Sequence, residues 1–116
     1  MLFFEKGKRR LNDLGIADVL TVPRVRGGYP AEKPSALSET LILQSSSAGD
    51  IVADPFMGSG SVGEAALKLS RRFLGNDVSD SALAHSRARF AKLGAQEGPV
   101  LSVPVPAQRR LSLVLP

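Results

Sequence analysis

Apolar positions in the middle of the chain follow two periods, one typical of helices and one typical of short buried strands. Residues 35–46, SALSETLILQSS, place Leu37 and Leu41 on one face of a predicted helix, with Ser35 as its N-cap. Residues 51–54, IVAD, form a short apolar run that is typical of a buried parallel strand. The pattern therefore begins with a helix that is followed by a strand.

A second and a third helix, with a strand between them, are predicted directly afterwards. The second helix is expected to begin near Ser61, because Ser61 and Glu64 have the spacing of a capping box. Residues 72–77, RFLGND, predict a second strand, and the helix after it is capped by Ser79 or Asp80. The buried side of this last helix is expected to consist of Leu83, Ala84, Ala88, Phe90 and Ala91. The alternation predicts an α/β fold, a Rossmann-like unit that is part of a doubly wound sheet.

The two ends of the chain have weaker patterns. Residues 1–28 are irregular and basic, with one possible strand at residues 19–22, VLTV. Residues 96–116 are spaced by prolines and are predicted to form an irregular tail, although the LSLVL near the end is equally consistent with a strand. The chain is thus divided into a basic N-terminal segment (1–28), an α/β unit (29–95) and a tail (96–116).

The composition limits the class of protein. With 116 residues the chain is one small domain or part of a larger one, and its net charge of +4 fits a polyanion such as DNA without requiring it. The chain contains no cysteine, which excludes disulfides and thiolate metal sites and fits a cytosolic location. It has no apolar run near the roughly 20 residues that a membrane span needs, and no signal-peptide pattern at residue 1. We therefore expect no membrane partner.

A glycine motif marks the turn between the first predicted strand and the second predicted helix. Gly58, Gly60 and Gly63 have the G-x-G-x-x-G spacing, and Asp77 follows 19 residues after the first of these glycines. A strand before the motif, a helix after it and an acid at this distance form the setting of a dinucleotide-binding fold. No Gly-Lys-Ser/Thr follows the turn, so a P-loop is excluded. A glycine-rich turn without a ligand remains the alternative.

The acid at the end of the first strand selects among the ligands of such a turn. Asp54 would repel the pyrophosphate of a nicotinamide dinucleotide, which binds at the helix N-terminus. S-adenosylmethionine has no phosphate and carries an α-ammonium group and a sulfonium, so a carboxylate suits it. Asp77, at the end of the next strand, is then suited to the two ribose hydroxyls. The alternatives are that Asp54 only caps the helix and that Asp77 is an ordinary acid at a strand end. We predict S-adenosylmethionine as the cofactor.

Two segments of the chain resemble a known family. The segment Tyr29-Pro30-Ala31-Glu32-Lys33-Pro34 and the later segment Asp54-Pro55-Phe56-Met57-Gly58-Ser59-Gly60 are similar to motifs of site-specific DNA amino-methyltransferases. These enzymes methylate adenine N6 or cytosine N4. The resemblance covers roughly residues 19–93 and corresponds to the S-adenosylmethionine-binding part of those enzymes.

The resemblance implies a role for each matching residue. Lys33, Pro34 and Ser35 are expected to line the cofactor pocket, and Asp77 to bind the ribose, where the family more often has Glu. The turn is expected to hold the methionine end of the cofactor. The complete set of expected cofactor-binding residues is Lys33, Pro34, Ser35, Asp54, Pro55, Phe56, Met57, Gly58, Gly60, Ser61 and Asp77.

The sequence differs from the family in one important respect. The catalytic tetrapeptide of the family, Asp/Asn/Ser-Pro-Pro followed by an aromatic residue, does not occur in it, so no catalytic or metal-binding residue is expected here. This difference leads us to expect the C-terminal part of a longer enzyme, or one chain that acts with an N-terminal catalytic partner. The basic segment 1–28 would then be the end of a DNA-facing region. Two other functions remain open: a cofactor-binding remnant that transfers nothing, and a dinucleotide-binding oxidoreductase domain.

Overall fold

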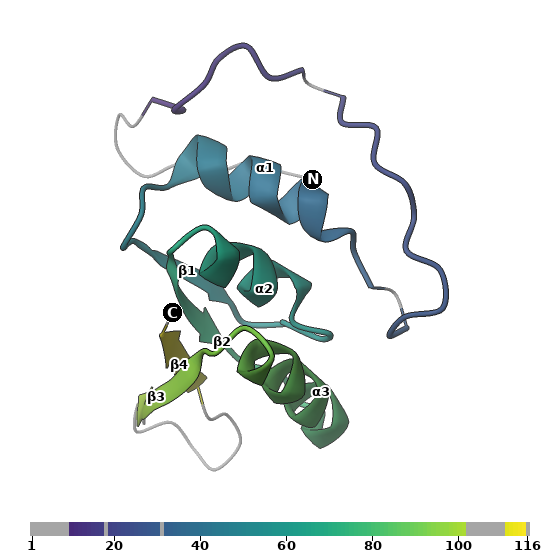
Figure 1. The fold of residues 1–116 in the computed structure, drawn as a ribbon, viewed down its shortest axis with the longest axis vertical. Helices are drawn as coiled ribbons and strands as arrows, with labels where there is room; N and C mark the ends of the chain where they lie inside the picture. Colours follow the sequence, from purple (N-terminus) through teal and green to yellow (C-terminus); the bar gives the residue numbers. More distant parts are fainter. Residues whose placement is uncertain (1–9, 18, 31, 102–110, 116) are drawn as a thin grey trace.

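The computed structural model describes residues 10–17, 19–30, 32–101 and 111–115. The described helices and strands follow one another along the chain as Figure 1 shows: α1 (Ser35–Ser45), β1 (Ile51–Asp54), α2 (Ser61–Lys68), β2 (Arg72–Gly75), α3 (Asp80–Ala91), β3 (Gln96–Leu101) and β4 (Leu111–Leu115). The predicted α/β fold is confirmed. Within the described ranges, no helix is both long enough and apolar enough to cross a membrane.

The described strands form one mixed sheet in the order β1-β2-β4-β3. β1 and β2 are parallel, with Ile51 opposite Arg72 and Asp54 opposite Gly75. β4 runs antiparallel to both β2 and β3. Because β1 and β2 are parallel, their carboxyl ends lie at the same edge, and the chain segments that follow them meet there. This register brings the glycine turn close to Asp77.

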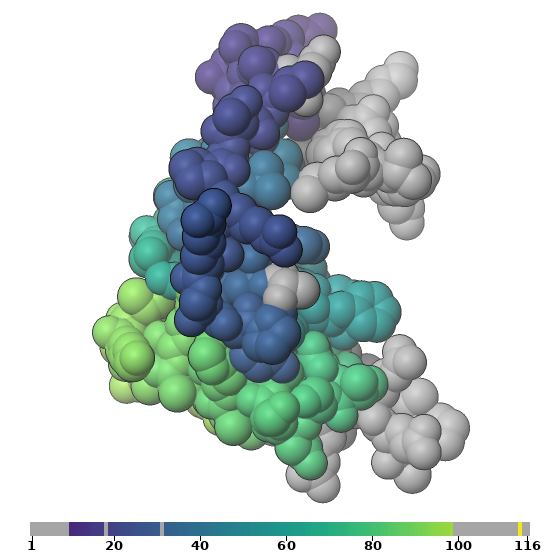
Figure 2. Space-filling model, turned by 90° about the vertical axis from the view of Figure 1, so that its right-hand side faces the viewer, coloured from purple at the N-terminus to yellow at the C-terminus, as the bar shows by residue number. Residues whose placement is uncertain are grey.

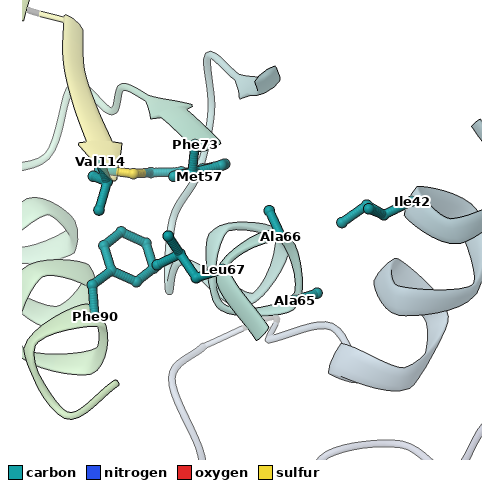
Figure 3. Packing of buried hydrophobic residues seen from close by; sticks show 8 residues of the cluster. All are labelled: Ile42, Met57, Ala65, Ala66, Leu67, Phe73, Phe90 and Val114. Atoms are coloured by element: carbon teal, nitrogen blue, oxygen red, sulfur yellow. The ribbon is translucent and has the colours of Figure 1, made fainter. Parts of the chain in front are cut away.

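The core lies between the sheet and the helices (Figure 3). Phe73 of β2 is fully buried, and its ring meets the ring of Phe90 of α3 edge to face, with 5.6 Å between the centroids. Ile42 extends the same cluster to α1. On the other face of the sheet Ile51 remains 51% exposed and Ala53 is exposed too, so the described helices cover the face that carries Phe73.

The N-terminal segment follows an extended path along the outside of the molecule (Figure 2). The strand predicted at residues 19–22 does not form, and Val19 is 79% exposed. Asn12 attaches the segment to the end of α1, since its side-chain amide donates to the carbonyls of Leu43 at 2.6 Å and Ser46 at 2.8 Å. These bonds satisfy carbonyl groups that a helix end leaves without partners.

The structure corrects the prediction of an irregular tail at residues 96–116. Residues 96–101 and 111–115 form β3 and β4, and residues 102–110 and 116 lie outside the described residues. The alternative that LSLVL forms a strand is confirmed by β4. β3 contains Pro99, but it lies at the edge of the sheet, where a missing N–H is tolerated, and its pairing with β4 is irregular between Glu97 and Val100.

The predicted start of α2 near Ser61 is confirmed, but the predicted side-chain caps are corrected for two of the three helices. Pro34 is the residue before α1, so Ser35 is already helical, and Gly60 occupies the corresponding position of α2 with a φ of 76°. Neither helix has a side-chain cap, and the capping box of Ser61 does not form. The Ser79 cap of α3 is confirmed, because its side chain accepts a hydrogen bond from the N–H of Ala82.

The buried side of α3 also differs from the prediction. Ala82, Ser86 and Phe90, spaced four residues apart, face the core. Of the residues predicted to be buried, Phe90 is confirmed and Leu83 is half-buried, whereas the three remaining side chains are exposed: Ala84, Ala88 and Ala91. The prediction placed these alanines in the core because they are apolar, but exposing so small a side chain to water costs little free energy, so alanine occurs on either side of a helix.

Gly63 of α2 provides a test of this packing. A Cβ at this position would lie 2.5 Å from Phe90 Cζ and 2.6 Å from Phe73 Cε1. In an exposed helix Gly→Ala stabilises by up to about 1 kcal/mol, but here we expect Gly63→Ala to lower the free energy of unfolding by about 1–3 kcal/mol through overpacking. Chemical denaturation of the chain measures the change.

Ala88→Gly on the exposed side of α3 is the control, and it should show only the loss due to helix propensity. A Gly63→Ala variant that is as stable as the wild type or more stable would contradict the close packing.

Candidate functional site

The turn between β1 and α2 is fixed to the end of β2 by backbone hydrogen bonds. The N–H of Asn76 donates to the carbonyl of Asp54 at 3.1 Å, and the carbonyl of Asn76 accepts from the N–H of Met57 at 2.9 Å. A tight turn follows, in which the N–H of Gly60 donates to the carbonyl of Met57 at 2.8 Å. The two strand ends therefore hold the glycine turn in one position.

Asp77 strengthens this connection with its side chain. Its Oδ2 accepts a hydrogen bond from the N–H of Gly58 at 2.9 Å, and its Oδ1 accepts from the N–H of Ser79 at 3.0 Å. A carboxylate offers about four acceptor positions, so further donors can still bind to this half-buried group. The acid that the sequence analysis assigned to a ligand thus also supports the turn.

Asp54 ends β1 at the beginning of the turn. Its Oδ1 accepts a hydrogen bond from the N–H of Phe56 at 3.0 Å, which is a local bond across two residues. Within the described part of the chain Asp54 has no cationic partner. Its charge is therefore available to a ligand.

A cavity of about 240 Å³ lies between the glycine turn and the described residues of the segment 29–33, which are residues 29, 30, 32 and 33. Both the turn and this segment contribute to its lining, which consists of Tyr29, Pro30, Lys33, Asp54, Phe56, Met57, Gly58, Ser59, Ser61 and Val62. Phe56 is 74% exposed there, whereas Ser59 and Ser61 are buried. The cavity has the mixed lining of charged, hydroxyl and aromatic groups that a polar ligand of moderate size requires.

Six of the predicted cofactor-binding residues line this cavity: Lys33, Asp54, Phe56, Met57, Gly58 and Ser61. The other five do not belong to its lining: Pro34, Ser35, Pro55, Gly60 and Asp77. Pro34 and Ser35 form the start of α1. A Cβ on Gly60 would lie 2.9 Å from Phe90 Cζ, so this glycine contacts the core. Their predicted roles in cofactor binding remain predictions.

Four further residues line the cavity that were not among the predicted cofactor-binding residues: Tyr29, Pro30, Ser59 and Val62. The sequence contained a signal for the first two, because they belong to the same segment as Lys33. Ser59 lies within the glycine turn. Val62 lies in the first turn of α2, directly after the glycine turn, and this position explains why it reaches the cavity.

A cluster of charged residues joins the two walls of the cavity, and we call it the Arg89 cluster: Glu32, Glu64, Lys68 and Arg89. The Arg89 guanidinium pairs with Glu32 and with Glu64, and it donates to the carbonyl of Ser59 at 3.0 Å. The hydrogen bond from Arg89 lowers the pKa of the Glu32 carboxyl below its ordinary value, against the effect of burial. Glu32 is therefore ionised near neutral pH.

A second cavity, of about 220 Å³, lies beside α3 and has a mainly apolar lining that includes Leu83, Phe90 and Val114. Met57 is the one predicted site residue in its lining, since the buried Met57 side chain contributes to both cavities. The first cavity is therefore the candidate site.

The fold and this cavity define a class: an α/β domain with a cavity at the carboxyl ends of two parallel strands, where ligands bind in open α/β sheets. Comparison with known families gives the particular one. The family model described as DNA methylase, of the N6/N4 type, matches residues 4–87. The chain therefore belongs to the N6/N4 DNA methylase family, and the resemblance noted in the sequence is confirmed.

Relatives with assigned names agree with this family. The chain is 43% identical to the type II methyltransferase M2.DpnII of Streptococcus pneumoniae over 69 residues, which cover 60% of the chain and 26% of that protein. It is 42% identical to the DNA adenine methyltransferase YhdJ of Escherichia coli over 67 residues, which cover 53% of the chain and 23% of that protein. The matches thus span about a quarter of each relative.

A solved structure supports the fold. The crystal structure of the M1.HpyAVI–SAM complex matches with a TM-score of 0.59 and 30% sequence identity, over 70% of the chain and 43% of that protein. The predicted Rossmann-like methyltransferase fold is therefore confirmed for the matching part of the chain.

Proposed function

We propose that residues 29–95 form the S-adenosylmethionine-binding unit of a DNA amino-methyltransferase that acts on adenine N6 or cytosine N4. The observation on which the proposal rests is the position of the strand-end acid, Asp54, in the lining of a cavity that residues of the glycine turn also line. The family match and the relatives' names support the class of reaction.

The residues of the cavity fit the methionine end of this cofactor. The Asp54 carboxylate would bind the α-ammonium group, and the N–H groups of the first turn of α2, which a helix leaves without partners, would bind the carboxylate. A Cβ on Gly58 would meet nothing within 4 Å, so the turn is open to a ligand there. The bound cofactor would supply a methyl group on a sulfonium, a strong electrophile.

The remaining predicted roles complete this proposal. Asp77 can accept hydrogen bonds from ribose hydroxyls while it holds Gly58. Lys33, from the opposite wall, would contribute its stem and charge. Pro34, Ser35, Pro55 and Gly60 would act through the backbone shape of the two walls.

DNA is the proposed partner. Arg10, Arg24 and Arg26 of the N-terminal segment are exposed, and such residues bind phosphates. The base-binding tetrapeptide of the family is absent from the sequence, so we propose that transfer to an extruded base requires a partner or further chain. An oxidoreductase domain is disfavoured because Asp54 would repel the pyrophosphate of its cofactor.

The first prediction concerns the choice of cofactor. Calorimetric titration should show that the chain binds S-adenosylmethionine more tightly than NAD, because Asp54 attracts a cation and repels a pyrophosphate. Asp54→Asn keeps an acceptor for the N–H of Phe56 but removes the charge. It should weaken binding of S-adenosylmethionine by roughly 1.5–3 kcal/mol and should not weaken binding of NAD. Equal affinity of the wild type for both compounds would refute the proposal.

The second prediction concerns Asp77. Asp77→Ala should weaken cofactor binding by roughly 1.5–3 kcal/mol, and it should also lower the melting temperature because Gly58 loses its acceptor. Titration with the 2′-deoxy cofactor separates the two effects in a double-mutant cycle. Removal of the 2′-hydroxyl should weaken binding to Asp77→Ala less than it weakens binding to the wild type. Identical losses would show that Asp77 supports the turn without touching that hydroxyl.

The third prediction concerns transfer. The purified 116-residue chain should bind the cofactor but should not methylate mixed-sequence duplex DNA in a tritiated-methyl assay, because it lacks the Pro-Pro-aromatic segment. Addition of a chain that contains this segment should restore transfer, and Asp54→Asn should abolish the restored activity. Turnover by the chain alone would contradict the prediction.

A further inference from the structure

Arg89 is the one described side chain that binds both walls of the candidate site. Its guanidinium pairs with Glu32 in the segment 29–33 and donates at 3.0 Å to the carbonyl of Ser59 in the glycine turn. Its Nε pairs with Glu64 in the first turn of α2. One planar group thus connects Glu32 to the glycine turn and to the first turn of α2, which lie about 30 residues further along the chain.

The burial of these groups gives the contacts weight. The Arg89 side chain is 23% exposed and that of Glu32 is 10% exposed. Exposed ion pairs contribute little to stability. The half-buried Arg89 guanidinium has two carboxylates and a carbonyl as acceptors, and charge-assisted hydrogen bonds to a planar guanidinium are among the strongest that arginine forms. The Lys68 Nζ lies 2.7 Å from the Glu64 Oε1, so the Glu64 carboxylate pairs with a second cation besides Arg89.

A second contact holds the same segment. His85, one helical turn before Arg89, meets the ring of Tyr29 with 5.0 Å between the centroids. Glu32 in turn accepts a hydrogen bond from the N–H of Tyr29 at 3.0 Å. One stripe of α3 therefore holds both ends of the loop from Tyr29 to Glu32, directly before Lys33.

We propose that Arg89 is a positioning residue of the candidate site, which holds the segment 29–33 at a fixed distance from the glycine turn. Without Arg89 the carboxylates of Glu32 and Glu64 would face each other with one cation fewer, and their repulsion would move the segment outward. Tyr29, Pro30 and Lys33 would then leave the positions in which they line the cavity. The effect on ligand binding rests on the proposed function, whereas the effect on the segment does not.

The experiment uses the complete chain and three variants. Arg89→Ala removes the guanidinium, and Arg89→Lys keeps the charge without the planar geometry. Arg87→Ala is the matched control, because Arg87 lies on the same helix and forms an ion pair with Glu97 in which both side chains are much more exposed. Glu32→Gln removes the carboxylate charge that pairs with Arg89, and it replaces Arg89→Ala in the experiment if that variant does not fold.

Amide hydrogen exchange is the measurement that needs no ligand. Arg89→Ala should increase exchange at the N–H groups of Tyr29 and Glu32, Arg89→Lys should increase it less, and Arg87→Ala should leave it unchanged. These N–H groups have acceptors in the wild type. Unchanged exchange in Arg89→Ala and in Glu32→Gln would overturn the proposal.

Calorimetric titration with S-adenosylmethionine, well below the melting temperature of each variant, gives the second measurement. We expect Kd to rise about tenfold or more in Arg89→Ala, with partial rescue in Arg89→Lys and no change in Arg87→Ala. A lower melting temperature with unchanged Kd would assign Arg89 a structural role and overturn the positioning role. If the wild type does not bind S-adenosylmethionine, the proposed function fails, and hydrogen exchange alone decides whether Arg89 holds the segment.

Discussion

The close packing of two glycines against two phenylalanine rings is the constraint on which the rest of the structure depends. Phe73 and Phe90 meet at the centre of the core, and a side chain on Gly60 or Gly63 would overlap with Phe90. This packing brings α2 close to both β2 and α3. The start of α2, and with it the glycine turn, is therefore placed by the core before any ligand is considered. Asp77 and the backbone of Asn76 then fix the turn from the other side.

This packing changes what the glycine motif means. All three glycines contributed to the predicted motif, and Gly58 and Gly60 were expected to bind the cofactor, but Gly60 and Gly63 are explained by contacts within the protein. Gly58 is different, because its φ is 49° and the space beside it is open. The argument for a ligand therefore rests on Gly58, on Asp54 and on the cavity between them and Lys33. The motif indicates a fold more strongly than it indicates a particular cofactor.

Local patterns predicted the central elements because each was supported by several independent features. β1, α2 and β2 were found from an apolar run, a glycine turn and a second run that ends near an acid. The pairing of β4 with β2, which depends on contacts between distant residues, could not be derived from local periodicity. The same holds for the Arg89 cluster, since Glu32 and Arg89 are 57 residues apart and each resembles an ordinary surface charge in the sequence.

Among the acids around the cavity, Asp54 differs from the others in its partners. Glu32 and Glu64 are neutralised by Arg89 and Lys68, so they contribute little net field to the site. Asp77 is engaged with the backbone of the turn. Asp54 differs from these acids, because within the described residues it accepts only a local backbone hydrogen bond and forms no ion pair, although Lys33 lines the same cavity. Under the proposed function, the ligand presents a cation at Asp54 and no dianion there, and this requirement separates an amino-acid group from a pyrophosphate.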